Sequence, residues 1–364
     1  MKISILDHGL AAKTGHHYDY CHSLAIHLIE SGVSVNVCGF QGARPEVGSA
    51  FRDLGCKFTP AFSRSPYAAF MPGASGHRTL DAIARRASRE MERIAGADLW
   101  LFPTLTADHL LAFAQTRNPP GMVGMVHTGP HALHALGGRA WALGCEKVLQ
   151  RGLKARIGAI DPLVRDLVQT YSQDLPIVNL PIPTHGPSRT SYRDRPRTIG
   201  FFGHQRQERG IALIPELSRR LLGLGYELVV HDTRQQLHFE NAGSTVQLRA
   251  FASDLRAEMV SCDIVVCPMD RANYTQRLSG IAYSALASGV PAVLPAGTLS
   301  AMRTLGLGSS CNYVEHTVDG ILGAIQRLAG NYPAYAQGAE RGAALFRQQH
   351  GIEKFVQRLL EPIP

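Results

Sequence analysis

Short apolar runs alternate with stretches of helical periodicity along the first half of the chain. The segment His16–Ser31, for example, carries apolar residues at helical spacing and stops at Gly32. Strands that read as continuous apolar runs, separated by helices, are typical of a parallel sheet covered on both faces. The strands predicted here are Lys2–Asp7, Val33–Cys38, Asp98–Phe102, Gly121–Val126, Ala155–Ile160 and Pro176–Pro181.

A segment of different composition, THGPSRTSYRDRPR at 184–197, interrupts this alternation. It is rich in Pro, Ser and Arg and offers almost nothing to bury, so it predicts a linker. The alternation then restarts. The predicted strands are Thr198–Phe202, Tyr226–His231, Val246–Phe251 and Asn312–Glu315, and the predicted helices are Arg209–Leu224, Asp254–Val260, one from Val318, and Ile352–Leu360.

This pattern predicts two doubly wound, Rossmann-like α/β domains facing across a cleft, with ligands beyond the carboxyl ends of the strands. We expect the first domain at 1–183 and the second at 198–345. Residues 346–364 are expected to form a C-terminal helix that could cross back to the first domain.

The stretch Tyr274–Pro295 predicts a candidate anion site. Its polar loop TQRLSG runs into a compact helix, IAYSALAS, which Gly289 is expected to end in the left-handed conformation. Free backbone N–H groups and the dipole at a helix N-terminus favour an anion. Ser279 adds a hydroxyl there, and Gly280 lets a ligand approach the backbone closely. We therefore expect a diphosphate at this helix start.

Composition and charge narrow the class of protein. Of 364 residues, 45% are hydrophobic and 18% are charged, which describes a well-buried globular protein of two domains. The net charge of +8 is shared evenly between the two halves, so an anionic ligand or surface fits better than nucleic acid. Aromatic residues, at 7%, offer little for base stacking.

The cysteines indicate a reducing compartment. They are odd in number and scattered, with no C-x-x-C pair, so we expect buried thiols rather than disulfides. The amino-terminal MKISILDHG turns polar too soon for a signal peptide, and no apolar run approaches the ~18–20 residues of a spanning helix. We expect a cytoplasmic protein. The cysteines are Cys21, Cys38, Cys56, Cys145, Cys262, Cys267 and Cys311.

Several segments together resemble the GT-B glycosyltransferases of glycosyltransferase family 4. IGFFGHQRQERGIALIPELSRRL, at 199–221, looks like the strand, glycine loop and helix that open their donor domain. DIVVCPMD at 263–270 and SALASGVPAVLP at 284–295 resemble a second donor-domain motif. LIESGVSVNV and VHTG agree with the first domain, so the resemblance covers nearly the whole chain in order and spacing.

The resemblance implies a nucleoside diphosphate sugar donor, UDP- or GDP-linked, with retention of configuration and no metal or other cofactor. The chain departs from the family at its paired glutamates, where Ser284 and Gln276 stand. A serine hydroxyl offers less to a ribose than a carboxylate does. The family's diphosphate-binding arginine and lysine become His204 and Arg209, with Arg206 between them. Arg209 keeps a permanent charge and a forked donor set suited to phosphate.

His127 follows the apolar strand GMVGMV, and the resemblance implies a histidine there close to the donor sugar. A near-neutral pKa would let it exchange a proton with a reacting hydroxyl. The alternative is a histidine that caps a helix starting near Pro130. The spacing of His127, His131 and His134 could suggest zinc, but no Cys or carboxylate completes the set, so we expect no metal.

Further candidates lie at the expected strand ends. Gly15, His16 and His17, between Thr14 and Tyr18, could line an acceptor or sugar pocket, or form a plain connection.

In the second domain, His231, Asp232 and Phe251 end two strands where the resemblance implies the nucleotide base. Phe251 is either a stacking platform or a core residue. Asp270 and Arg271 could reach the sugar or the diphosphate, or form a solvated ion pair.

The helix Arg78–Ala95 carries Arg85, Arg89 and Arg93 opposite its apolar face. This segment is either a core helix with a solvent-exposed basic face or a helix that makes a weak, salt-sensitive contact with anionic lipid headgroups. The second option would make the protein peripheral at the inner membrane face.

The expected function is transfer of a sugar to a glycan or lipid-linked acceptor, in surface polysaccharide or glycoconjugate synthesis. Two alternatives stay open. One is a sugar-nucleotide epimerase or hydrolase on the same fold. The other is a non-catalytic nucleotide- or glycan-binding pseudoenzyme, for which the missing glutamates argue. The sequence leaves the base, the sugar, the acceptor and the oligomeric state open.

Overall fold

The computed structural model consists of two compact units, each described by itself. Unit 1 comprises Met1–Pro183 and His350–Pro364, and unit 2 comprises Thr184–Gln349. The structure describes all backbone positions except residues 14, 65–75, 130–136, 173, 181–185, 233, 234, 236, 238, 240–244, 250–254, 276, 362 and 364, and it leaves out the side chains of residues 16 and 76–79.

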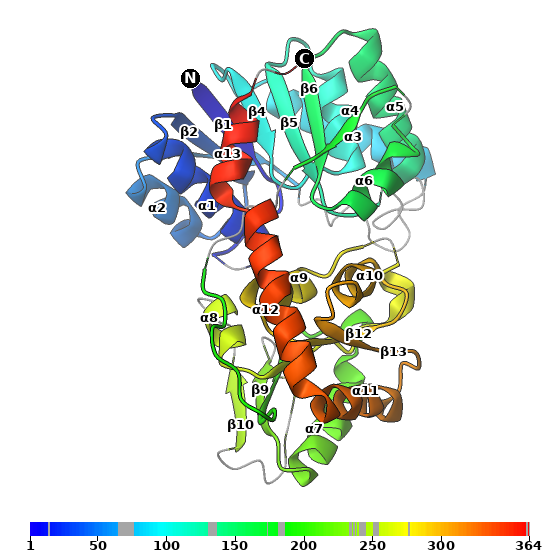
Figure 1. Ribbon diagram of the computed structural model, residues 1–364. Helices are drawn as coiled ribbons and strands as arrows, with labels where there is room; N and C mark the ends of the chain where they lie inside the picture. Colours follow the sequence, from blue (N-terminus) through cyan, green and yellow to red (C-terminus); the bar gives the residue numbers. More distant parts are fainter. Residues whose placement is uncertain are drawn as a thin grey trace. The chain divides into compact units, whose positions relative to one another are not determined.

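The sheet of unit 1 is parallel throughout its described strands, in the order β3-β2-β1-β4-β5-β6-β7 (Figure 1). The strands are β1 Lys2–Leu6, β2 Ser34–Phe40, β3 Lys57–Phe62, β4 Leu99–Phe102, β5 Gly121–Val126, β6 Ala155–Ala159 and β7 Ile177–Asn179. The edge strand β3 was not predicted. Its sequence KFTPAF contains Pro60 and is mostly part-exposed, so it lacks the apolar run of a central strand.

Helices cover both faces of this sheet, as the apolar strands predicted. They are α1 His16–Glu30, α2 Pro45–Asp53, α3 Gly76–Met91, α4 Ala107–Gln115, α5 Gly137–Gln150, α6 Pro162–Gln169 and α13 Ile352–Leu360. Helix α4 packs against α3 and α5, and α1 packs against α13. The predicted return of the C-terminal helix to the first domain is confirmed, with Phe355 and Leu359 buried there.

Unit 2 repeats the architecture with the strand order β10-β9-β8-β11-β12-β13, again parallel. Its strands are β8 Thr198–Phe201, β9 Glu227–His231, β10 Val246–Arg249, β11 Ile264–Val266, β12 Ala292–Pro295 and β13 Ser310–Tyr313. Its helices are α7 Ile214–Gly223, α8 Leu255–Val260, α9 Gly280–Ser288, α10 Leu299–Leu305, α11 Val318–Gly330 and α12 Tyr332–Gln349, with the short turns η3 Gln207–Arg209, η4 Ile211–Leu213 and η6 Arg271–Asn273. The two doubly wound α/β domains are therefore confirmed.

The helix predicted from Arg209 to Leu224 begins later, at Ile214. Gly210 has φ 73°, a left-handed conformation that interrupts the helix, and Pro215 is suited to the first turn of α7. A Cβ at Gly210 would collide with the carbonyl oxygen of Pro268. The glycine therefore lets the loop after β8 pack directly against the end of β11.

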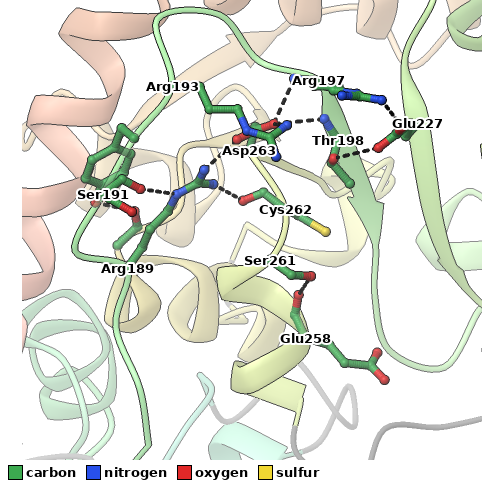
Figure 2. A network of polar contacts seen from close by, with 12 residues as sticks. Arg189, Ser191, Arg193, Arg197, Thr198, Glu227, Glu258, Ser261, Cys262 and Asp263 are labelled. Atoms are coloured by element: carbon green, nitrogen blue, oxygen red, sulfur yellow. Dashed lines mark hydrogen bonds and ion pairs between the residues drawn. The ribbon is translucent and has the colours of Figure 1, made fainter.

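The segment 184–197 differs from the predicted linker because its described residues pack onto unit 2. Asp263 is 1% exposed and forms a salt bridge with Arg189 Nη2 at 2.5 Å. Its carboxylate also accepts hydrogen bonds from the backbone N–H groups of Arg197 and Thr198 at 2.7 and 2.9 Å (Figure 2). The Tyr192 hydroxyl donates to the Gly289 carbonyl at 2.7 Å. The arginines of this segment thus satisfy a buried carboxylate, which composition alone does not reveal.

Candidate functional site

The loop after β8 places the guanidinium of Arg209 against Gly203. Gly203 has φ 85°, and a Cβ added there would lie 2.6 Å from Arg209 Nη1 and 2.9 Å from Ile281 Cδ1. Arg209 and the first turn of α9 therefore lie against the same glycine. The side chain of Arg209 is half-buried, and its guanidinium makes no hydrogen bond or ion pair with any residue that the structure describes.

The start of α9 has the predicted form, with Ser279 as N-cap and Gly289, at φ 69°, as a left-handed C-cap. Ser279 is buried, and its hydroxyl accepts from the Ala282 N–H at 3.3 Å, so this hydroxyl serves the helix rather than facing solvent. Gly280 is exposed, with no atom within 4 Å of a Cβ placed there. Within the described part of the chain, the N–H groups of Gly280 and Ile281 have no hydrogen-bond partner. An open, positively polarised helix end thus lies beside Arg209.

Two other predicted basic residues lie on the same loop. Arg206 is exposed, and its Nη1 lies 3.5 Å from Glu208 Oε1, so part of its charge is offset. His204 is half-buried. The Asp270 N–H donates to the Glu208 carbonyl at 3.1 Å, which ties the loop after β11 to the loop after β8.

The carboxylate of Asp270 is hydrogen-bonded within its own turn. Its Oδ1 accepts from the Ala272 N–H at 3.0 Å, and its Oδ2 accepts from Asn273 Nδ2 at 3.2 Å, so it caps η6. The neighbouring Arg271 lies over Gly297, where a Cβ would be 2.9 Å from Nη2. Ser284 is half-buried on α9, whereas Gln276 and Phe251 lie outside the described residues.

His231 is hydrogen-bonded to the backbone of the Gly203 loop and does not reach solvent. It is fully buried, its Nδ1 accepts from the Gly203 N–H at 3.4 Å, and its Nε2 lies 2.7 Å from Glu258 Oε2. An acceptor Nδ1 leaves the proton on Nε2, which can donate to the carboxylate. Asp232, also buried, accepts from the Leu237 N–H at 2.7 Å. Sequence reasoning did not single out Gly203, although its position after a buried strand was the available signal.

In unit 1, the loop after β1 brings together a buried carboxylate and an imidazole. Asp7 Oδ2 lies 2.9 Å from His17 Nδ1, and Asp7 Oδ1 accepts from the Gly9 N–H at 2.7 Å. A Cβ at Gly9 would collide with the His17 ring. The carboxylate holds Nδ1–H and so favours the tautomer in which Nε2 carries a lone pair, the form that a general base needs.

Gly15, at φ 82°, precedes α1 and forms its N-cap position without a side-chain bond. The backbone turn predicted there is therefore present. Thr14 and the side chain of His16 lie outside the described residues.

His127 follows β5, as predicted, and contacts two neighbouring elements of unit 1. Its Nε2 donates to the Pro103 carbonyl at 2.7 Å, and its ring stacks on Tyr20 with centroids 5.3 Å apart. Burial lowers the pKa of His127 to about 4, against the opposing effect of the Pro103 hydrogen bond. His127 is therefore neutral at pH 7, with its Nε2 proton engaged by the protein. The residues His131, His134 and Pro130, weighed with it, lie outside the described part.

The basic face of α3 is partly paired. Arg85 contacts Asp81, and Arg86 Nε lies 3.4 Å from Glu90 Oε1, while Arg89 and Arg93 are exposed. Among the described residues, no helix combines the length and apolar character needed to cross a membrane.

A hollow of about 510 Å³ in unit 1 lies away from these loops. Residues 91, 92, 94–97 and 116–120 line it together with Trp100. These segments precede β4 and β5, so the hollow is at the amino ends of the strands. Ligands of doubly wound sheets bind at the opposite, carboxyl ends.

Comparisons with known proteins give the architecture a context. No protein-family model and no curated protein matches the sequence. Among solved structures, sucrose-phosphate synthase from Thermosynechococcus elongatus matches with a TM-score of 0.68 at 12% identity, over 98% of this chain and 97% of that one. The glycosyltransferase SnogD from Streptomyces nogalater matches with a TM-score of 0.62 at 16% identity, over 99% of both chains.

The Anabaena protein HepE, solved with UDP and glucose, matches with a TM-score of 0.63 at 14% identity, over 99% of this chain and 98% of that one. At such identities the likeness concerns the fold alone. Both units are included in each match, since nearly the whole of each chain is covered. The chain therefore has the GT-B fold of these glycosyltransferases.

Proposed function

We propose that the chain is a glycosyltransferase that moves a sugar from a nucleoside diphosphate sugar to a glycan or lipid-linked acceptor. The observation that carries this proposal is the Arg209 guanidinium, which has no described partner and lies against Gly203 beside the open start of α9. The GT-B fold supports it, and the UDP in the HepE structure supports a nucleotide donor for this fold.

On the donor side of this mechanism, the protein stabilises the negative charge of the leaving group. When the glycosidic bond to the diphosphate breaks, negative charge develops on the departing phosphate oxygens. A fixed guanidinium and preorganised N–H groups stabilise that charge without reorganisation, which is usually the largest catalytic contribution. Arg209 and the N–H groups of Gly280 and Ile281 supply these donors in unit 2. This step needs no metal on the diphosphate.

The acceptor side of the mechanism rests on unit 1. The Asp7–His17 pair provides an oriented imidazole that can take a proton from an acceptor hydroxyl. His127 belongs to the same unit, and its ring is neutral and held in place by the hydrogen bond to Pro103. Its role in this mechanism is to position the substrate rather than to exchange a proton. Retention of configuration follows from the family 4 resemblance alone.

A surface polysaccharide or glycoconjugate is the product we propose, made in the cytoplasm with weak contact to the inner membrane face. Arg89 on α3 and Arg93 in the turn after it are the exposed charges that would attract anionic headgroups. Such contact would be salt-sensitive, because exposed charges are screened.

The direct test is a panel of UDP- and GDP-sugars incubated with the purified chain, with and without oligosaccharide or lipid-phosphate acceptors. Mass spectrometry would follow both the free nucleotide diphosphate and the glycosylated acceptor. We expect acceptor-dependent release of one nucleotide diphosphate. Failure of every donor to bind or turn over would contradict the proposal.

The position of Ser284 favours one alternative, a nucleotide-binding pseudoenzyme, because a serine replaces the glutamate implied by the family. The same panel separates these possibilities. A pseudoenzyme would bind nucleotide diphosphate without turnover. An epimerase or hydrolase would convert the donor without any acceptor.

A further inference from the structure

Three potential metal ligands gather in the interior of unit 1. His8 follows β1, and Asp108 and His109 lie in the first turn of α4. Their side chains are 4%, 2% and 1% exposed, and one ligand atom from each lies within 4.8 Å of the other two. Two elements distant in sequence thus bring two imidazoles and a carboxylate to one buried point.

Each of the three residues also has a buried polar atom without a hydrogen-bond partner among the residues that the structure describes. His8 Nε2, Asp108 Oδ2 and His109 Nε2 are buried and make no hydrogen bond within the described part of the chain. A buried polar atom without a partner costs about 1–3 kcal/mol, and nearly all such atoms in native proteins are satisfied. One such atom on each residue of a cluster whose ligand atoms lie within 4.8 Å of one another indicates a missing bound species rather than three separate defects.

Thr106 orients two of the three ligands. Its hydroxyl donates to Asp108 Oδ1 at 2.6 Å, so its oxygen is left to accept from His109 Nδ1 at 3.0 Å. A proton on Nδ1 leaves the Nε2 lone pair of His109 available to a metal ion. An outer hydrogen bond of this kind, which fixes tautomer and ring orientation, accompanies nearly every metal-binding histidine.

We propose that His8, Asp108 and His109 bind one divalent transition-metal ion, with Zn²⁺ the best match. Two imidazole nitrogens and one carboxylate oxygen are a common zinc donor set, whereas Ca²⁺ and Mg²⁺ prefer oxygen ligands throughout. Zinc bonds of about 2.0–2.2 Å place tetrahedral ligand atoms about 3.4 Å apart, so the three atoms must move closer together than the 4.8 Å limit when the ion binds.

The protonation of the site is compatible with metal binding. Burial, followed by the charges of His109 and His17, lowers the pKa of His8 well below its ordinary value. Burial also lowers the pKa of His109, against the opposing effect of Asp108. Neutral imidazoles are the form that coordinates a metal, so protons do not compete at pH 7.

The proposed ion would hold the loop after β1 against the start of α4. That loop also carries Asp7, the partner of His17, so the metal would have a structural role next to the candidate general base. The expectation of no metal considered only histidines close in sequence. The His8 site instead depends on a contact between residues one hundred positions apart. It is independent of the proposed transferase activity.

The first experiment uses Zn²⁺ alone. The full chain is stripped with a chelator, dialysed, and titrated with zinc while binding stoichiometry and thermal unfolding are measured. We expect one tight equivalent and a Tm rise of about 3–7 °C at 100 times the Kd. If the wild-type chain binds no stoichiometric zinc and its Tm does not move, the proposal is overturned.

Variants then locate the site. Asp108→Asn and His109→Gln should each abolish the tight equivalent, while His27→Gln, a half-buried histidine of α1 outside the cluster, should keep it. Thr106→Ala should weaken zinc affinity by about 10- to 100-fold and Thr106→Ser should restore it. Thr106 makes no side-chain cap bond, so this pair tests ligand orientation rather than helix capping.

Cobalt substitution provides a measurement that does not depend on the variants folding. Co²⁺ bound by two nitrogens and a carboxylate in the wild-type chain should show the visible absorption of a low-coordinate site and be displaced by one equivalent of Zn²⁺. A tight equivalent that survives in well-folded Asp108→Asn would place the metal elsewhere and refute this assignment.

Discussion

The guanidinium of Arg209 lies against the α-carbon of Gly203. A side chain at this position would be strained by the φ of 85°, and its Cβ would lie 2.6 Å from Nη1. Because the obstructing group is the end of a flexible side chain, a Cβ would displace the guanidinium rather than the backbone. The glycine therefore sets where the positive charge lies.

Gly203→Ala should weaken nucleotide diphosphate binding by about 10-fold, since a charge-assisted hydrogen bond is worth about 1.5–3 kcal/mol and the displaced Arg209 keeps part of it. Gly225→Ala is the matched control. Gly225 also has φ 85°, but nothing lies within 4 Å of its Cβ position. Both variants should lose about 1–2 kcal/mol of stability from backbone strain. Calorimetric titration with UDP and GDP measures the difference, and equal affinities in the two variants would contradict the role of Gly203.

Asp263→Ala should lower the free energy of unfolding by about 3–5 kcal/mol, because it leaves the nearly buried Arg189 without its partner and removes acceptors for two backbone N–H groups. Glu227→Gln, which breaks the exposed pair with Arg197, should cost less than about 1 kcal/mol. Urea unfolding followed by circular dichroism compares them. Similar losses in the two variants would show that the Asp263 network does not fasten the segment after residue 184.

The stability of the protein should fall as pH drops from about 6.5 to about 4. A histidine in the unfolded chain titrates near 6.5, whereas burial lowers the pKa of His127 to about 4. In this window the unfolded chain binds a proton that the folded chain does not, so unfolding is favoured by acid.

His127→Gln should make this pH dependence shallower, because glutamine can donate to Pro103 but does not titrate. The remaining dependence comes from groups such as His8, whose pKa is also lowered by burial. Unfolding free energies at pH 7, 6 and 5 provide the comparison. Identical slopes in the wild-type chain and the variant would disprove the neutral state of His127.

Gly9→Ala should displace the His17 ring and lower the transfer rate by about 100-fold, the usual effect of misplacing a catalytic group by about 1 Å. Nucleotide affinity should not change, because the affected residues are all in unit 1. His17→Ala should cause a similar loss, and the double variant should lose no more than either single one. Full activity in Gly9→Ala would remove His17 from the reaction.

The elements with strong local signals were predictable from sequence. Helix α9 was found because Gly289 ends it in the left-handed conformation, and α13 because Ile352–Leu360 carries a clear amphipathic pattern. The edge strand β3 was missed for the opposite reason, since Pro60 and its part-exposed neighbours resemble a loop. The delayed start of α7 depends on the packing of Gly210 against Pro268, which local sequence does not encode.

For the candidate site, the sequence predicted which charged residues take part but not how they are arranged. Arg209 was identified from the resemblance to family 4, in which a diphosphate-binding lysine takes its place, but its distance from α9 depends on two loops meeting at Gly203. The sequence predicted the Ser279 hydroxyl at the helix start, but it did not show that this hydroxyl also caps α9, whose first turn needs an acceptor. The His8 cluster left no signal at all, since its members come together only when β1 and α4 pack.

The central claim is that Arg209 and the start of α9 bind a nucleoside diphosphate. The most direct measurement is the Kd of UDP, GDP and the corresponding nucleosides for the wild-type chain, Arg209→Ala and Arg219→Ala. Arg219 is exposed on α7 and paired with Glu216, so it controls for the change of charge. We predict that Arg209→Ala weakens diphosphate binding by about 10- to 100-fold, with nucleoside binding and Arg219→Ala unchanged. Equal diphosphate affinity in Arg209→Ala and the wild-type chain would contradict the claim.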